Sequence, residues 1–226
     1  MAERRPHDVE LYRRGRERLL GLLDGADTET MVTACPTWRV HDVVAHVTGI
    51  ASDFVVGRLP GGDVGAWTAE QVEARRDVAL DTVLDEWERV APDFEEAMAG
   101  RLAGASGRLS ADVISHSFDV AAALGRPLPR QGELVEGALA TFADMLTARL
   151  DQAGSGGVVI DTGSSLLIAG TATPVATLRA DTFSALRVLS GRRTADEIRS
   201  LGWEGDPGPV YSLLSPYPLP ERSLGE

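Results

Sequence analysis

The pattern of apolar residues changes once along this chain, and that change is the strongest constraint on its fold. Up to about residue 152, apolar side chains recur at helical spacing in segments separated by short polar breaks. Beyond the glycine-rich stretch at 154–157 they form short runs typical of β-strands. We therefore predict an α+β protein in which a helical bundle, residues 1–153, precedes a small α/β domain, residues 154–226.

The expected elements follow from this periodicity and from capping residues. Helices are expected over residues 8–23, 40–56, 69–76, 79–99, 110–125 and 132–152, and then over 182–189 and 195–201. Strands are expected over residues 158–160, 166–168 and 175–179. The expected N-caps are Thr68, Ser110, Asp181 and Thr194. The tail from Trp203 is rich in glycine and proline and is expected to be irregular.

Composition excludes several classes of function. A net charge of −12 argues against nucleic acid or an anionic membrane surface as a partner. No apolar run approaches the roughly 20 residues that span a bilayer, and the first residues lack the apolar core of a signal peptide, so we expect a cytoplasmic protein. All 22 basic residues are arginine, which excludes a Schiff-base lysine and a P-loop lysine.

Three polar residues in two expected helices suggest a metal site. Asp112 and His116 are four residues apart, so one helical face presents a carboxylate and an imidazole together. His46 lies among valines on the apolar side of its own helix. Two imidazoles and one carboxylate suit zinc and leave a fourth position open for chemistry. The alternatives are a buried His46 bonded to a backbone carbonyl and an exposed Asp112–His116 ion pair.

Five further residues near these segments have two interpretations each. Asp119, three residues after His116, could hold the second nitrogen of that ring, or could anchor its helix to an arginine. Cys35 could be a catalytic thiol, although a small buried side chain at a turn is favoured. Arg75 and Arg76 could bind a carboxylate of a cofactor or lie on the surface. His41 could also be a metal ligand, although a position at the surface is favoured.

Three segments resemble one protein family. CPTWRVHDVVAHV at residues 35–47 resembles the CPxWxVxDLvaHl signature of the mycothiol-dependent maleylpyruvate isomerase family. SHSFDVAAALGRP at 115–127 resembles that family's HxxDlaxalGrp segment. GRRTADEIRSLGWEGDP at 191–207 resembles its C-terminal domain. The lysine-free composition agrees with the actinobacterial source that this family implies.

This resemblance implies a fold and a cofactor chemistry. The family combines a DinB-like metal-binding four-helix bundle with a small sterol-carrier-like α/β domain. Its ligand set of His, Glu and His maps onto His46, Asp112 and His116, so Asp112 is a departure that shortens the carboxylate. The family binds Zn²⁺ or another divalent metal and uses mycothiol as its thiol cosubstrate. The metal deprotonates this thiol and makes it a nucleophile at neutral pH.

The resulting expectation is a zinc-dependent thiol transferase or isomerase that acts on a small electrophile. One alternative is a biosynthetic lyase or cyclase on the same scaffold. Another is a ligand-binding bundle without catalysis, in which Asp112 marks a decayed metal site. The C-terminal domain either supplies pocket residues, such as Arg179 or Trp203, or pairs protomers in a homodimer.

Overall fold

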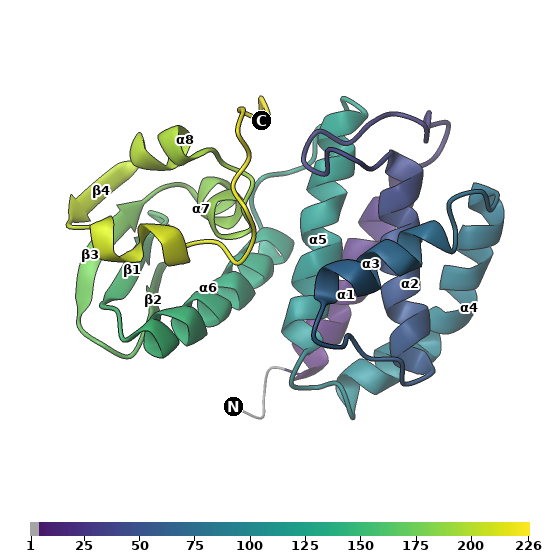
Figure 1. The fold of residues 1–226 in the computed structure, drawn as a ribbon, viewed down its shortest axis with the longest axis horizontal. Coiled ribbons are helices and arrows are strands. Elements are labelled where there is room, and N and C mark those ends of the chain that lie inside the picture. Colours follow the sequence, from purple (N-terminus) through teal and green to yellow (C-terminus); the bar gives the residue numbers. More distant parts are fainter. Residues whose placement is uncertain (1–4) are drawn as a thin grey trace. The chain divides into compact units, whose positions relative to one another are not determined.

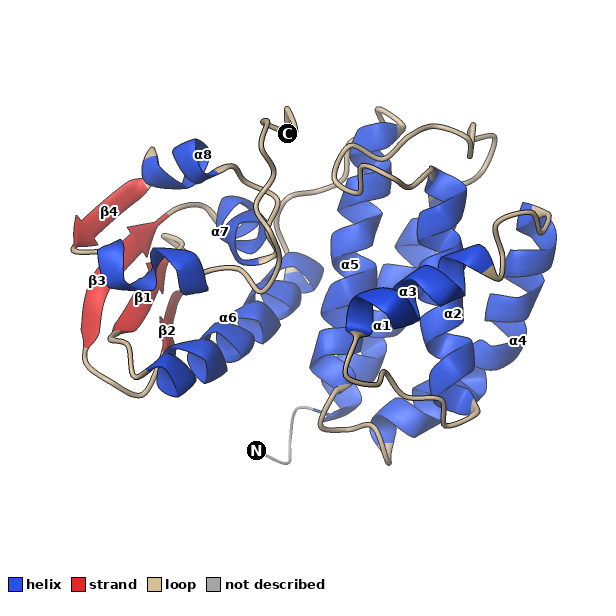
Figure 2. Ribbon diagram, viewed as in Figure 1, coloured by secondary structure: helices blue, strands red, loops and turns tan. Residues whose placement is uncertain are grey.

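Two units make up the fold of residues 5–226, the part of the chain that the computed structural model describes (Figure 1). They divide between Leu128 and Pro129. The first unit is helical, and the second combines helices with a four-stranded sheet (Figure 2). The α+β class is therefore confirmed. Among the described helices, none has the length and apolarity needed to cross a membrane.

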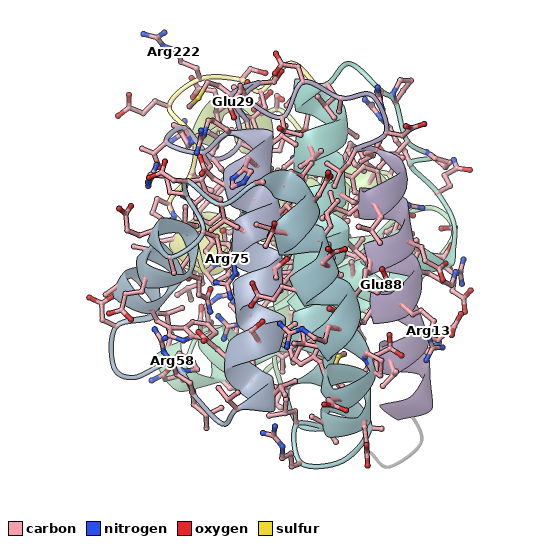
Figure 3. All side chains as sticks on the ribbon, turned by 90° about the vertical axis from the view of Figure 1, so that its right-hand side faces the viewer. Arg13, Glu29, Arg58, Arg75, Glu88 and Arg222 are labelled. Carbon is pink, nitrogen blue, oxygen red and sulfur yellow. The ribbon has the colours of Figure 1, made fainter. Side chains whose placement is uncertain are left out.

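The helices of the first unit pack in pairs around an apolar core. They are α1 (Arg5–Gly21), α2 (Val40–Val55), α3 (Val64–Glu73), α4 (Leu80–Ala99) and α5 (Ser106–Ala123). Helix α1 lies along α5 and α2 lies along α4, while the short α3 packs on α2. Trp87 at the centre is fully buried, and its Nε1 donates a 2.8 Å hydrogen bond to the Tyr12 hydroxyl. Charged residues such as Arg13 and Glu88 lie on the outside of these helices (Figure 3).

Two of the expected helix starts in this unit are wrong. Helix α3 begins after Asp63, whose carboxylate accepts a 2.9 Å hydrogen bond from Ala66 N, so Thr68 lies inside the helix. Helix α5 begins at Ser106, one turn before Ser110. The Ser110 hydroxyl instead lies 2.6 Å from the carbonyl oxygen of Asp8 on α1 and 2.9 Å from that of Ser106, four residues earlier. Serine is a residue type that favours helix N-caps, but here it lies inside the helix and its hydroxyl bonds to backbone carbonyls.

The second unit places helices against a mixed sheet. Its elements are α6 (Glu133–Ala153), β1 (Gly157–Asp161), β2 (Leu166–Ala169), β3 (Pro174–Arg179), α7 (Thr182–Leu189), α8 (Ala195–Arg199), β4 (Gly202–Gly205) and the 3₁₀ helix η1 (Gly208–Leu213). The strand order is β2-β1-β3-β4, with β1 and β3 parallel and the outer pairs antiparallel. Asp181 and Thr194 cap α7 and α8, as predicted.

Two expectations about the second unit are corrected. Helix α6 packs on β2 and α7, so the unit boundary lies before it rather than at residue 153. Gly154 adopts a φ of 61° as the left-handed C-cap of α6, which explains the glycine there without a hinge between domains. The tail is also more regular than expected, because β4 pairs with β3 from Gly202 to Gly205 and η1 follows it.

Candidate metal centre

A tight loop before α2 brings Cys35 and Trp38 to the candidate site. Val32 N–H donates to the Trp38 carbonyl at 2.9 Å, and Trp38 N–H donates to the Cys35 carbonyl at 2.8 Å. Met31 and Arg39 form a β-bridge at the base of this turn. The Trp38 ring centroid lies 5.0 Å from that of His46 and 6.1 Å from that of His116. This loop therefore forms an aromatic wall against both imidazoles.

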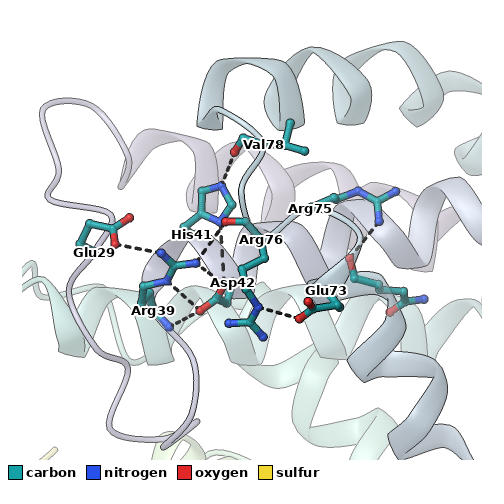
Figure 4. A network of polar contacts seen from close by, with 9 residues as sticks. Glu29, Arg39, His41, Asp42, Glu73, Arg75, Arg76 and Val78 are labelled. Atoms are coloured by element: carbon teal, nitrogen blue, oxygen red, sulfur yellow. Dashed lines mark hydrogen bonds and ion pairs between the residues drawn. The ribbon is translucent and has the colours of Figure 1, made fainter.

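An ion pair with a buried carboxylate lies at the start of α2, directly after this loop (Figure 4). The Arg39 guanidinium donates to both oxygens of Asp42, at 3.0 Å from Nε and 2.9 Å from Nη2, and the Arg39 backbone N–H donates at 2.9 Å. The Asp42 side chain is only 1% exposed. Burial by itself raises the pKa of Asp42, but the hydrogen bonds from Arg39 outweigh it and hold this pKa below its usual range.

His41 belongs to the same network and is buried, so its expected surface position is wrong. Its Nε2 lies 2.8 Å from the carbonyl of Val78, in the segment between α3 and α4 (Figure 4). This contact links the start of α2 to a segment 37 residues further along the chain. His41 therefore contributes to packing and stands apart from the metal-ligand candidates.

The predicted trio of His46, Asp112 and His116 comes together in the first unit. His46 lies on α2, and Asp112 and His116 lie on α5. His46 Nε2 is 3.6 Å from Asp112 Oδ2, and His116 Nε2 is 3.8 Å from Asp112 Oδ1. The two imidazoles meet edge to face, with ring centroids 5.4 Å apart and an interplanar angle of 83°. Both histidines are buried, whereas the Asp112 side chain remains 26% exposed.

These separations fit a divalent cation. Two ligands at about 2.1 Å from a tetrahedral zinc lie about 3.4 Å apart. The two observed separations, 3.6 Å to Oδ2 and 3.8 Å to Oδ1 of Asp112, are close to that value for one oxygen each. One donor atom from each of the three residues lies within 4.8 Å of the others. The residues present therefore fit the metal that their donor types predict. The shorter side chain of Asp112 still reaches both histidines.

The second nitrogen of each imidazole has its own partner. His116 Nδ1 lies 3.1 Å from Asp119 Oδ2, the contact predicted for Asp119. His46 Nδ1 lies 3.2 Å from Oε1 of Gln71 on α3. A metal-bound histidine commonly donates its second N–H in this way, which fixes the orientation of the ring. Both Nε2 atoms are consequently left to face Asp112.

Gly49 makes the contact of Gln71 with His46 geometrically feasible. A Cβ atom on Gly49 would lie 2.6 Å from the Cβ of Gln71 and 2.8 Å from its Cγ. Real Cβ atoms do not approach other atoms this closely, so only glycine at this position lets α3 pack so near α2. This close approach brings the Gln71 amide to the ring of His46, which lies one helical turn before Gly49 on α2.

Cys35 lies closer to the site than its favoured interpretation as a turn residue implies. Its sulfur, a ring nitrogen of His116 and a carboxylate oxygen of Asp119 lie within 4.8 Å of one another. The thiol is partly exposed and contacts His116 through a side-chain hydrogen bond. Sulfur, nitrogen and oxygen donors therefore form a second ligand group that shares His116 with the first.

The environment of His116 favours its protonated form in the metal-free protein. Burial by itself lowers the pKa of this imidazole. The negative charge of Asp112 and the hydrogen bonds to Asp119 and Cys35 act in the opposite direction and raise the pKa to about 10. A cation at Nε2 must therefore displace a proton from His116.

Arg75 and Arg76 are both engaged by protein carboxylates. Arg75 forms a two-pronged pair with Glu86 on α4, at 2.9 and 2.6 Å, and also donates to the carbonyl of Gln71. Arg76 pairs with Glu73 at 2.7 Å (Figure 4). These contacts give no support to a role in cofactor binding. For both arginines that role stays a prediction.

Gln71, Asp53 and Trp38 are the neighbours of the site that sequence reasoning did not assign to it. Gln71 shares a buried face of α3 with Trp67, four residues earlier. A glutamine on an otherwise apolar helix face needs a buried hydrogen-bond partner, and this is the sequence signal that could have pointed to it. Asp53 lies seven residues after His46 on the same face of α2. Trp38 belongs to the family-like segment at 35–47, but the pattern does not show which way its ring points.

Fold and site together define a helical bundle with a candidate metal centre, followed by a small mixed α/β unit. Residues 10–107 match the family model described as the mycothiol maleylpyruvate isomerase N-terminal domain. This match covers less than half of the chain and makes its helical unit similar to that domain.

Solved structures agree on the fold. A mycothiol-dependent maleylpyruvate isomerase superposes with a TM-score of 0.64 at 17% sequence identity, covering 89% of this chain and 93% of that one. A histidine-to-alanine mutant of such an isomerase gives a TM-score of 0.61 at 16% identity, with the same coverage. These similarities establish the fold. Comparison with curated proteins gives no significant sequence match.

Proposed function

We propose that this protein is a metal-dependent thiol transferase or isomerase that uses mycothiol to act on a small electrophile. The observation that carries the proposal is the convergence of His46, Asp112 and His116 at distances suited to one zinc ion. The family match and the solved isomerase structures of the same fold support the choice of mycothiol as the thiol.

The proposed ligands are His46 Nε2, one Asp112 oxygen and His116 Nε2. Zinc bound there supplies a Lewis acid that lowers the pKa of a thiol in the remaining position. Gln71 contacts Nδ1 of His46, and Asp119 contacts Nδ1 of His116. These contacts keep the Nε2 atoms of both rings directed at the proposed metal position. Trp38 shields one side of the imidazoles from water, while the partial exposure of Asp112 leaves a side open to ligands.

Zinc affinity is expected to rise with pH because His116 must lose its proton on binding. With a pKa of about 10, His116 is protonated at neutral pH, so the apparent zinc association constant should rise about tenfold per pH unit between roughly pH 7 and 8.5. Competition with a chromophoric chelator of known pH dependence measures this slope. A flat profile would contradict the assigned state of His116.

The metal-free fold should respond to pH with the opposite sign. A histidine whose pKa is raised on folding stabilises the native state fully below its unfolded pKa of about 6.5. This contribution is lost as the pH rises toward the folded value of about 10. Urea unfolding of the zinc-free protein should therefore give a midpoint that declines across this range, whereas an unchanged midpoint would count against the coupling.

Thiol chemistry is the direct test of the proposed activity. Zinc-loaded protein should accelerate the consumption of mycothiol by a panel of cis-enone diacids and other soft electrophiles, measured by loss of free thiol. Asp112→Asn, which removes the charge and keeps the size, should lower this rate together with zinc affinity. Fully loaded protein that accelerates neither thiol addition nor cis–trans isomerisation would contradict the proposal.

A further inference from the structure

A chain of buried side chains extends from His46 away from the candidate metal ligands. His46 Nδ1 lies 3.2 Å from Gln71 Oε1, and Gln71 Nε2 donates to Asp53 Oδ2 at 3.0 Å. The three residues are 6%, 2% and 8% exposed, respectively. On its other side, Asp53 Oδ1 lies 3.7 Å from Nη1 of Arg58, a residue whose side chain is half exposed. A buried aspartate thus ends this hydrogen-bonded chain of side chains, on the side away from the metal-ligand candidates.

The chemistry of Asp53 gives this chain a direction. An ionised carboxylate only accepts hydrogen bonds, so the amide nitrogen of Gln71 must face Asp53. The amide oxygen of Gln71 must then face His46, and an oxygen can only accept. His46 Nδ1 is therefore the donor in the remaining contact. In the neutral ring this places the proton on Nδ1 and leaves the lone pair on Nε2, which faces Asp112.

The reverse orientation would disable His46 as a ligand. If the Gln71 amide turned over, its NH₂ group would face His46 Nδ1 and favour a lone pair there. The proton of the neutral ring would then lie on Nε2, directed at Asp112 and at any cation beside it. An amide alone allows both arrangements, because its oxygen and nitrogen have nearly the same shape. The carboxylate of Asp53 supplies the preference.

We propose that Asp53 and Gln71 are positioning residues that select the Nδ1–H tautomer of His46 and so keep its Nε2 available to a metal ion. The inference deepens the proposed function and rests on it for the identity of the ligand. The tautomer itself is a property of the metal-free protein. It can therefore be measured whether or not zinc binds.

Nitrogen NMR of the metal-free protein tests the tautomer directly. Long-range ¹H–¹⁵N correlation at about pH 8.5, where an ordinary histidine is neutral, distinguishes the protonated ring nitrogen from the one with a lone pair. The His46 signals are identified by their loss in His46→Gln. The wild type should show Nδ1–H for His46. Asp53→Asn should give a mixture of the two tautomers, because asparagine can present either its amide NH₂ or its amide oxygen to Gln71.

A double variant separates the effect of hydrogen-bond direction from an effect on side-chain packing. In Asp53→Asn combined with Gln71→Glu, the new carboxylate accepts from His46 Nδ1–H and the new amide donates to that carboxylate. The direction of the chain is restored with the negative charge moved next to the ring. We expect Asp53→Asn alone to weaken zinc binding by about 10- to 100-fold, the range typical of an outer partner, and the double variant to recover it. Arg58→Gln, which touches Asp53 from outside the chain, should change neither property.

The outcomes are distinct for the two proposals. Wild-type protein with the Nδ1–H tautomer and no affinity for zinc would overturn the proposed function while upholding this inference. Zinc binding with an unchanged His46 tautomer in Asp53→Asn would overturn the inference and leave the function standing. A loss of affinity that the double variant fails to restore would also overturn it, because it would assign Asp53 to packing alone.

Discussion

Replacing either His46 or His116 with alanine is expected to abolish stoichiometric zinc binding at micromolar protein. Each change removes one of the three proposed ligands and leaves Asp112 with a single imidazole within reach. Removal of an outer partner typically weakens metal binding 10- to 100-fold, and loss of a direct ligand should exceed that range. Equilibrium competition with a chelator, combined with metal analysis after gel filtration, measures the effect for each variant.

His41 provides the matched control on the same helix. It is buried like His46, but its Nε2 is bound to the carbonyl of Val78 rather than directed at Asp112. His41→Gln keeps a side-chain donor there and should leave zinc stoichiometry at one. Equal losses in the His41 and His46 variants would point to general damage of the fold. Full zinc binding in both His46→Ala and His116→Ala would remove these residues from the site.

Arg39→Leu is expected to lower the free energy of unfolding by about 1–3 kcal/mol, the cost of leaving a buried polar group without a hydrogen-bond partner. Arg39 provides three donor contacts to the carboxylate of Asp42, which is only 1% exposed. One of these, the backbone N–H, survives the substitution, while both guanidinium contacts are lost. Urea unfolding at neutral pH measures the difference.

Two further variants test the cause of this loss. Arg39→Leu combined with Asp42→Leu removes both charges and should recover much of the stability, because no buried carboxylate remains unpaired. Arg76→Leu removes a guanidinium whose ion pair with Glu73 is exposed, and should leave the free energy of unfolding almost unchanged. An Arg39→Leu protein as stable as the wild type would show that the network in Figure 4 contributes little.

The same ion pair has a defined pH dependence. Arg39 holds the pKa of Asp42 below its usual range, so the stabilisation is present above the unfolded pKa of about 4. It is lost as the pH falls through the lower folded value, where Asp42 becomes protonated. The stability gap between wild type and Arg39→Leu should therefore be widest near neutral pH and should narrow under acid conditions.

Within the described residues, periodicity allowed the sequence to predict most helices, three of the four strands and the convergence of His46, Asp112 and His116. Asp112 and His116 are four residues apart on one helix, so their shared face follows from helical geometry alone. His46 could be paired with them because it lies on the apolar side of a second helix, which must turn inward. In both cases a local pattern determines the direction of a side chain.

Contacts between distant segments were beyond the same reasoning. Gln71 reaches His46 only because Gly49 lets α3 pack closely on α2, and no spacing rule links residues 25 positions apart. His41 is buried by a bond to Val78, 37 residues away. Helix α6 has an ordinary amphipathic pattern, which does not tell whether its apolar face covers a bundle or a sheet. Strand β4 contains two glycines and exists through its pairing with β3.

Anomalous X-ray diffraction from zinc-soaked crystals, recorded on both sides of the zinc absorption edge, tests the proposed metal centre most directly. The predicted result is one strong peak between α2 and α5, about 2.0–2.2 Å from His46 Nε2, His116 Nε2 and an Asp112 oxygen. A peak bound by Cys35, His116 and Asp119, or no peak in the first unit at all, would contradict the site on which the proposed function depends.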